Sequence, residues 1–170
     1  TNAILVLHAL TGTQHAAGIN QSVPGVAPLW TDECVVGWWD AFIGPGKALD
    51  TDRYFVICAN YLGGCYGSTG PRSINPRTGQ AYGSQFPQVS AWDVLRSQLR
   101  LLGSLGINCF HAVTGGSMGG MLSILLATRC PHRVKNVLPI ATGLETTVLH
   151  RVHNFEQILA IRNDPNFQGG

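Results

Sequence analysis

The sequence contains one serine in a setting that favours covalent chemistry. The run TGGSMGG at residues 114–120 includes the pattern Gly-x-Ser-x-Gly around Ser117. This pattern is typical of a serine on a sharp turn between a strand and a helix, where it attacks acyl groups. The turn strains the backbone, and glycine at the flanking positions avoids clashes. Because the apolar run CFHAV precedes the pattern and MLSILLATRC follows it, we predict that Ser117 is a nucleophile; the alternative is a packing turn.

Two backbone N–H groups are predicted to stabilise the negative charge that forms when Ser117 attacks a carbonyl. Met118 would begin a helix, whose N-terminal N–H groups and dipole favour an anion. With this type of turn, the second donor comes from the loop after an earlier strand. The run ILVLH at 4–8 predicts such a strand, and ALTG follows it. We assign the second N–H to Leu10, and we expect His8 to position this loop.

A serine nucleophile also needs a histidine base and an orienting acid, in the chain order serine, acid, histidine. After Ser117 the acids are Glu145, Glu156 and Asp164, and the histidines are His132, His150 and His153. Glu145 with His150 or His153 satisfies this order, but all three lie on or beside one predicted helix, which disfavours the pair. We expect instead that the acid and the base lie outside this chain, which also begins inside a predicted strand.

Strands and helices are expected to alternate along the chain. Continuous apolar runs, typical of strands buried on both faces, occupy residues 4–8, 54–59, 109–113 and 134–141. Helical patterns occupy residues 94–105, 118–130 and 146–162. The alternation predicts an α/β fold with a mostly parallel sheet, helices on both faces, and one partial core domain over residues 1–170. Two long irregular segments, 11–46 and 62–88, carry aromatic residues and are expected to form ordered loops.

Composition argues against several classes of function. The 11 Lys and Arg residues against 9 Asp and Glu give a net charge of only +2, and no basic run occurs, so nucleic-acid binding is not expected. No apolar stretch approaches the roughly 20 residues of a membrane span. Five cysteines without a Cys-x-x-Cys pair predict reduced thiols in a cytoplasmic protein and no metal site. Cys58 and Cys109 fall in predicted strands and are expected to be buried.

Longer blocks of sequence are more specific than the serine pattern. They are HALTG at 8–12, GWWDAFIGPGKALDTDRYFVICAN at 37–60, LGGCYGSTGPRSINPRTGQAYG at 62–83, FPQVSAWD at 86–93, GGSMGGM at 115–121 and AIRNDPNFQGG at 160–170. In these blocks the chain resembles the homoserine O-acetyltransferase family of methionine biosynthesis. The resemblance implies an α/β-hydrolase core, truncated here so that later strands and a helical lid are missing, and a homodimer at full length.

The resemblance also implies a ping-pong reaction. Ser117 would accept an acetyl group from acetyl-CoA and pass it to the hydroxyl of L-homoserine, with Met118 and Leu10 as backbone donors. The family's Asp and His partners of the serine would lie outside this chain. No cofactor is expected to be bound permanently, since acetyl-CoA is a co-substrate, and the expected partners are these small molecules. Asn60, at the end of the second predicted strand, is a candidate substrate-binding residue.

Other functions fit the same residues. Succinyl-CoA could replace acetyl-CoA as the donor, and serine could replace homoserine as the acceptor. Esterases and thioesterases use the same turn, and they would release CoA without an amino-alcohol acceptor. The 170 residues, with a nucleophile but without its base, are expected to be inactive alone. Many relatives have Gln after GGSMGGM, where this chain has Leu122.

Overall fold

The chain divides into two compact units in the computed structural model, which describes residues 1–26 and 29–167. Unit 1 comprises residues 1–70 and 88–142, and unit 2 comprises residues 71–87 and 143–170. The end of the block AIRNDPNFQGG, residues 168–170, lies outside the described residues. Ser117, Met118, Leu10 and Asn60 all belong to unit 1.

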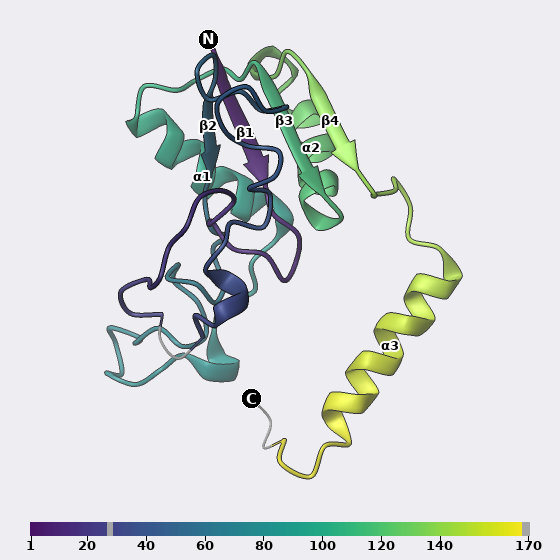
Figure 1. Ribbon diagram of the computed structural model, residues 1–170. Coiled ribbons are helices and arrows are strands. Elements are labelled where there is room, and N and C mark those ends of the chain that lie inside the picture. The colour runs from purple at the N-terminus through teal and green to yellow at the C-terminus, as the bar shows by residue number, and fades with distance from the viewer. Residues whose placement is uncertain (27–28, 168–170) are drawn as a thin grey trace. The chain divides into compact units, whose positions relative to one another are not determined.

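Unit 1 is built on a four-stranded parallel sheet in the order β2-β1-β3-β4 (Figure 1). Its strands are β1 (Ala3–Leu7), β2 (Phe55–Cys58), β3 (Ala112–Gly116) and β4 (Val137–Ile140). In the register of β1 and β3, Leu7 lies opposite Gly115. Because the strands are parallel, their carboxyl ends share one edge of the sheet. The segments that carry Leu10 and Ser117 therefore leave this edge from neighbouring strands.

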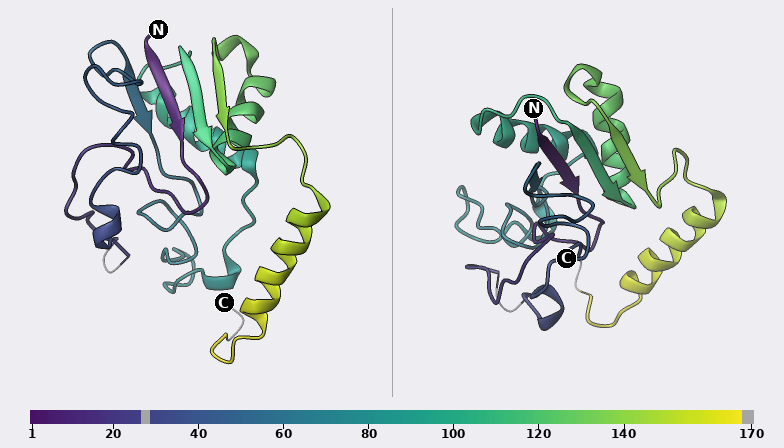
Figure 2. Two further views of the ribbon diagram at one scale, coloured as in Figure 1. Left: turned by 45° about the vertical axis from the view of Figure 1, so that its right-hand side comes forward. Right: turned by 45° about the horizontal axis from the view of Figure 1, so that its top comes forward.

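Two helices of unit 1 pack on one face of this sheet (Figures 1 and 2). Helix α1 (Ala91–Ser104) begins with a capping box, in which the Ser90 hydroxyl accepts from the Asp93 N–H and the Asp93 carboxylate accepts from the Ser90 N–H. Helix α2 (Met118–Arg129) begins directly after Ser117, and Pro131 follows its end. Proline there cannot continue the helix, since it lacks an N–H.

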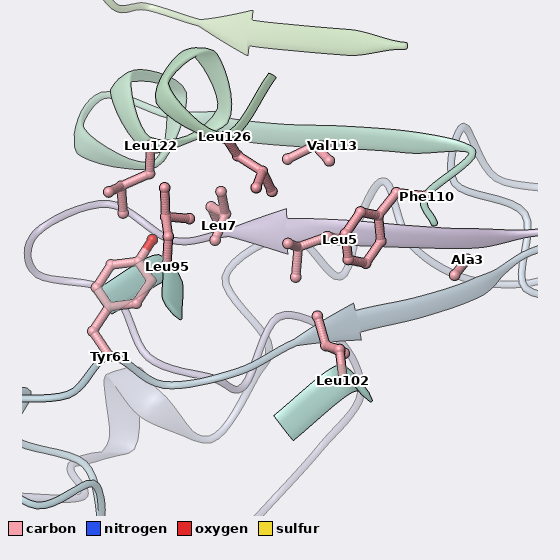
Figure 3. Close-up of a cluster of buried hydrophobic side chains, with 10 residues drawn as sticks. All are labelled: Ala3, Leu5, Leu7, Tyr61, Leu95, Leu102, Phe110, Val113, Leu122 and Leu126. Carbon is pink, nitrogen blue, oxygen red and sulfur yellow. The ribbon is translucent and has the colours of Figure 1, made fainter. Parts of the chain in front are cut away.

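The main core fills the space between the sheet and these two helices (Figure 3). Leu5 and Leu7 of β1 point to this face, because alternate residues of a strand face the same side. They pack among buried side chains of both helices, namely Leu95, Leu102, Leu122 and Leu126. Leu122 is thus a core residue, only 3% exposed.

The opposite face of the sheet is covered differently from the sequence prediction. Ile4 and Val6 of β1 pack there against Trp38 and Trp39 of a loop. Helices were predicted on both faces, but in the described part of unit 1 both helices lie on the face of Leu5 and Leu7. The physical reason is that the chain between β1 and β2 is rich in turn residues, and its described part forms no helix longer than a short 3₁₀ turn, Asp32–Cys34.

The third strand lies three residues later than predicted. The apolar run predicts a strand over residues 109–113, but β3 spans Ala112–Gly116. Glycines extend the strand because pairing uses backbone groups, which glycine also offers. Upstream, Phe110 forms only an isolated bridge with Val134, and Cys109 is exposed rather than buried.

Unit 2 contains helix α3 (Val148–Arg162), which begins at Thr147, whose hydroxyl accepts a hydrogen bond from the His150 N–H. An antiparallel bridge between Ile74 and Ala81 precedes a short 3₁₀ turn, Gly83–Gln85. A third 3₁₀ turn, Pro131–Arg133, belongs to unit 1.

Neighbouring leucines of α1 provide a test of the main core. Leu102 is fully buried, whereas Leu101 is 49% exposed. We expect Leu102→Ala to lower the free energy of unfolding by about 2–5 kcal/mol, because it leaves a cavity in the core. The control, Leu101→Ala, should cost less than about 1 kcal/mol. Urea unfolding followed by circular dichroism measures both, and equal losses would contradict the packing described.

Candidate active site

Ser117 lies on a strained turn between β3 and α2. Its backbone has φ 53° and ψ −117°, a conformation that residues other than glycine rarely adopt. The Ser117 N–H donates to the carbonyl of Ile140 at 3.0 Å, and the Ser117 carbonyl accepts from the Met121 N–H at 3.1 Å. The surrounding backbone thus holds the strain, as is common where a side chain must be presented for chemistry. Ser117 itself is exposed.

The glycines around Ser117 allow close packing of α2 against the sheet. A Cβ atom at Gly115 or at Gly119 would overlap the carbonyl oxygen of Leu7. At Gly120 it would lie 2.6 Å from Cγ2 of Thr142, also too close. Gly116 differs, because a Cβ atom there would meet nothing within 4 Å. The spacing Gly-x-Ser-x-Gly thus reflects two points where the turn touches the end of β1.

The loop after β1 lies against the same turn. A Cβ atom at Gly119 would also come within 2.9 Å of the His8 carbonyl oxygen. The Ala9 carbonyl accepts from the Gly12 N–H at 3.0 Å and contacts His8 Nδ1 at 2.8 Å. Leu10, between them, is 76% exposed. Among the described residues, neither the Leu10 N–H nor the Met118 N–H donates a hydrogen bond.

His8 is buried and uncharged at neutral pH. Only 2% of the residue is exposed, and burial lowers its pKa, although the Ala9 carbonyl and the nearby Asn60 amide oppose this shift. Since a carbonyl can only accept, Nδ1 carries the proton and donates to Ala9. His8 Nε2 is therefore the unprotonated nitrogen, and it has no hydrogen-bond partner among the described residues.

Sequence reasoning missed the part that Tyr61 plays in this loop. The Tyr61 hydroxyl donates to the His8 carbonyl at 2.6 Å, and the two rings stack with centroids 3.7 Å apart and an interplanar angle of 18°. Tyr61 is 5% exposed and belongs to the main core. The available signal was its position shortly after β2, where it reaches the edge of the sheet near the end of β1.

Asn60 lies beside His8 and lines a groove of about 310 Å³ between its loop and α1. Both atoms of its side-chain amide are buried without a hydrogen-bond partner among the described residues. Across the groove, Gln98 of α1 donates to the Ala59 carbonyl at 3.2 Å. Among the described residues, no hydrogen bond joins the Asn60 side chain to Ser117, and its role in substrate binding stays a prediction.

The acid and the two histidines that satisfy the chain order after Ser117, namely Glu145, His150 and His153, belong to unit 2. There, His153 Nδ1 lies 3.7 Å from a carboxylate oxygen of Glu156, one turn along α3, and both side chains are exposed. Among the described residues of unit 1, no histidine forms a hydrogen bond with the Ser117 hydroxyl. The described residues also hold no cluster of three or more His, Cys, Asp or Glu that could bind a metal.

The comparisons with known proteins agree with this geometry. A family model described as the alpha/beta hydrolase fold matches residues 2–165. The chain belongs to this family. Its parallel sheet and its serine turn are those that the α/β-hydrolase resemblance implied, and the predicted fold class is confirmed.

Curated relatives of this α/β-hydrolase chain are named as enzymes that transfer acyl groups to homoserine. It is 48% identical over 169 residues to a homoserine O-acetyltransferase of Solidesulfovibrio magneticus, which covers 99% of this chain and 40% of that protein. It is 48% identical over 170 residues to a homoserine O-succinyltransferase of Halorhodospira halophila, covering 100% of this chain and 42% of that protein. The resemblance to the homoserine O-acetyltransferase family is confirmed. The chain spans about two fifths of the length of these relatives.

Solved structures similar to this α/β-hydrolase chain include transferases and esterases. The structure of homoserine O-acetyltransferase from Bacillus anthracis matches with a TM-score of 0.86 and 39% identity, covering 100% of this chain and 45% of that one. A variant of esterase E22 matches with a TM-score of 0.86 and 36% identity over the same shares. The fold of this region therefore occurs both in a homoserine O-acetyltransferase and in an esterase.

Gly119 and Gly116 form a matched pair that tests the packing of this turn. We expect Gly119→Ala to destabilise the protein by about 1–3 kcal/mol, because the new Cβ atom forces α2 away from β1. It should also abolish reaction of Ser117 with acyl esters. Gly116→Ala, where the space is open, should change both far less. Urea unfolding and esterase assays measure the two effects, and equal behaviour of the variants would contradict the close contact.

Cysteine reactivity tests the burial near the site. Burial raises the pKa of the Cys58 thiol to about 12, so at pH 8 roughly one part in ten thousand is the reactive thiolate. We expect Cys58 to resist alkylation by iodoacetamide in the folded protein, and to react once urea unfolds it. Exposed Cys65 and Cys109 serve as internal controls. Peptide mass spectrometry measures each site, and labelling of native Cys58 at the rate of Cys65 would contradict the prediction.

Proposed function

We propose that the protein containing this chain is a homoserine O-acetyltransferase that works through an acetyl-enzyme on Ser117. The observation that carries the proposal is the exposed serine at φ 53°, at the N-terminus of α2, where the first turn of this helix touches the end of β1 and the loop after it. The similarity to homoserine O-acyltransferases along the whole chain supports the choice of substrates.

In the first half-reaction, Ser117 Oγ attacks the thioester carbonyl carbon of acetyl-CoA. The carbonyl oxygen becomes an oxyanion, and the Leu10 and Met118 N–H groups donate hydrogen bonds to it. The α2 dipole adds to this stabilisation, since Met118 is the first helical residue. Collapse of the intermediate breaks the carbon–sulfur bond, and CoA leaves as a thiol once it takes up the proton that Ser117 released. Hydrogen bonds of this kind typically contribute a factor of about 10²–10³ per donor.

In the second half-reaction, the hydroxyl of L-homoserine attacks the acetyl carbon on Ser117. The same two N–H groups stabilise a second oxyanion, and Ser117 Oγ leaves with a proton as O-acetylhomoserine forms. A histidine moves these protons and an aspartate orients it. By resemblance to the family, we place both residues outside this chain. This places the acceptor pocket partly outside the chain as well.

The remaining properties follow from the same proposal. Acetyl-CoA and L-homoserine are small-molecule partners, no cofactor is bound permanently, and the full-length protein forms a homodimer in the cytoplasm. Residues 1–170 would be one partial core domain. Among the described residues, no helix is both long and apolar enough to cross a bilayer.

Two alternatives differ in donor and acceptor. The similarity to a homoserine O-succinyltransferase supports succinyl-CoA as the donor. The structural similarity to esterase E22 supports hydrolysis, in which water replaces homoserine as the acceptor. All three reactions use the same Ser117 acyl-enzyme, so the assay must vary donor and acceptor independently.

CoA release by the protein expressed from its complete gene tests the proposal. We expect release from acetyl-CoA to require L-homoserine and to fall by at least about 10³-fold in Ser117→Ala, because the acyl-enzyme cannot form. Thiol detection with Ellman's reagent follows CoA, and mass spectrometry identifies the acylated amino acid. Succinyl-CoA and L-serine are run as the competing donor and acceptor.

Each result has one meaning. Faster release from succinyl-CoA than from acetyl-CoA would identify succinyl-CoA as the donor. Acylation of L-serine in place of L-homoserine would identify serine as the acceptor. Release that is indifferent to both amino acids would make the protein an esterase or thioesterase. Turnover that survives Ser117→Ala would contradict the nucleophile itself.

A further inference from the structure

The peptide bond between Ala9 and Leu10 is held from one side. The Ala9 carbonyl oxygen accepts from His8 Nδ1 at 2.8 Å and from the Gly12 N–H at 3.0 Å. The carbonyl of Ala9 and the N–H of Leu10 belong to the same planar, trans peptide group, so they point in opposite directions. Fixing the carbonyl of Ala9 therefore fixes the direction of the Leu10 N–H, which faces away from His8 and Gly12.

A second layer of contacts fixes His8. Its ring stacks on the ring of Tyr61, and its carbonyl accepts from the Tyr61 hydroxyl at 2.6 Å. Tyr61 in turn is anchored in the main core, where Figure 3 shows its ring beside Leu95 and Leu122. Burial raises the pKa of Tyr61, so its hydroxyl keeps its proton and remains a donor.

The same contacts tie the loop to the serine turn. The His8 carbonyl that Tyr61 binds lies against Gly119, two residues after Ser117. A Cβ atom at Gly12 would come within 2.9 Å of the His8 Cβ, so glycine is needed for the turn to close on His8. Tyr61 thus reaches from the end of β2 to the point where the loop after β1 touches the first turn of α2.

We propose that Tyr61 and His8 are positioning residues that orient the Leu10 N–H as an oxyanion donor for Ser117. Tyr61 holds the backbone and ring of His8, and His8 Nδ1 holds the Ala9 carbonyl. If the Ala9–Leu10 peptide rotated, its carbonyl oxygen would take the place of the N–H donor and repel a developing oxyanion. The inference rests on the proposed role of Ser117, but not on the identity of the donor or acceptor.

Acylation of Ser117 by p-nitrophenyl acetate tests the proposal, because this ester needs neither CoA nor homoserine. The protein from its complete gene is used, and the p-nitrophenol burst gives the acylation rate constant and its KM. We expect Tyr61→Phe, which keeps the stacked ring, and His8→Phe, which removes the Nδ1 donor, to lower the rate constant by about 10- to 100-fold. KM should change little, because the bound ester carries no oxyanion and the charge develops only as Ser117 attacks.

Two kinds of control separate positioning from folding. His8→Asn places an amide N–H where Nδ1 lies, and it should recover most of the rate lost in His8→Phe. On the other face of the sheet, the rings of Tyr54 and His111 pack against each other at a tilt of 32°, with centroids 4.8 Å apart. Tyr54→Phe and His111→Phe make the same chemical changes away from Ser117, and they should leave the burst unchanged. Thermal unfolding of every variant accompanies the kinetics.

The outcomes are distinct. Bursts as fast in Tyr61→Phe and His8→Phe as in the Tyr54 and His111 variants would overturn the proposal, as would rate losses that simply follow the melting temperature or that His8→Asn does not reverse. A normal burst with no transfer to homoserine would refute the proposed function but still allow the positioning test. A burst that persists in Ser117→Ala would overturn both.

Discussion

The contact between the first turn of α2 and the end of β1 sets the geometry of the candidate site. Gly115 and Gly119 lie so close to the Leu7 carbonyl that no side chain fits between them. This approach brings the Ser117 turn and the loop with Leu10 together from two strands far apart in sequence. Any larger residue at these glycines would separate the turn that carries Ser117 from the end of β1 and the loop that follows it.

The sheet makes this contact possible, because β1 and β3 are adjacent and parallel. Their register places Leu7 beside Gly115, so both strands end at the same level. The buried leucines of α1 and α2 then hold both helices against one face of the sheet. Tyr61 belongs to this core and also binds the His8 carbonyl, so the packing of the core extends directly into the loop of the site.

Much of the fold was predictable because the signals are local. The apolar runs predicted all four strands, and the helical patterns predicted α1, α2 and α3, with ends that differ by a few residues. The sequence could not predict that β3 includes Gly115 and Gly116, since pairing there depends on the neighbouring strands. Nor could it predict that Trp38 and Trp39 cover the second face, where neither α1 nor α2 of unit 1 lies.

By itself, the sequence determined the turn that carries Ser117, the predicted nucleophile. A serine between glycines, after an apolar strand and before a helix, requires a strained turn, and Ser117 has one. Only the tertiary structure decided how the second donor is oriented. The direction of the Leu10 N–H depends on His8, and His8 depends on Tyr61, which is 53 residues away in the chain. Contacts across such a separation arise from strand order and packing, and no local pattern of residues encodes them.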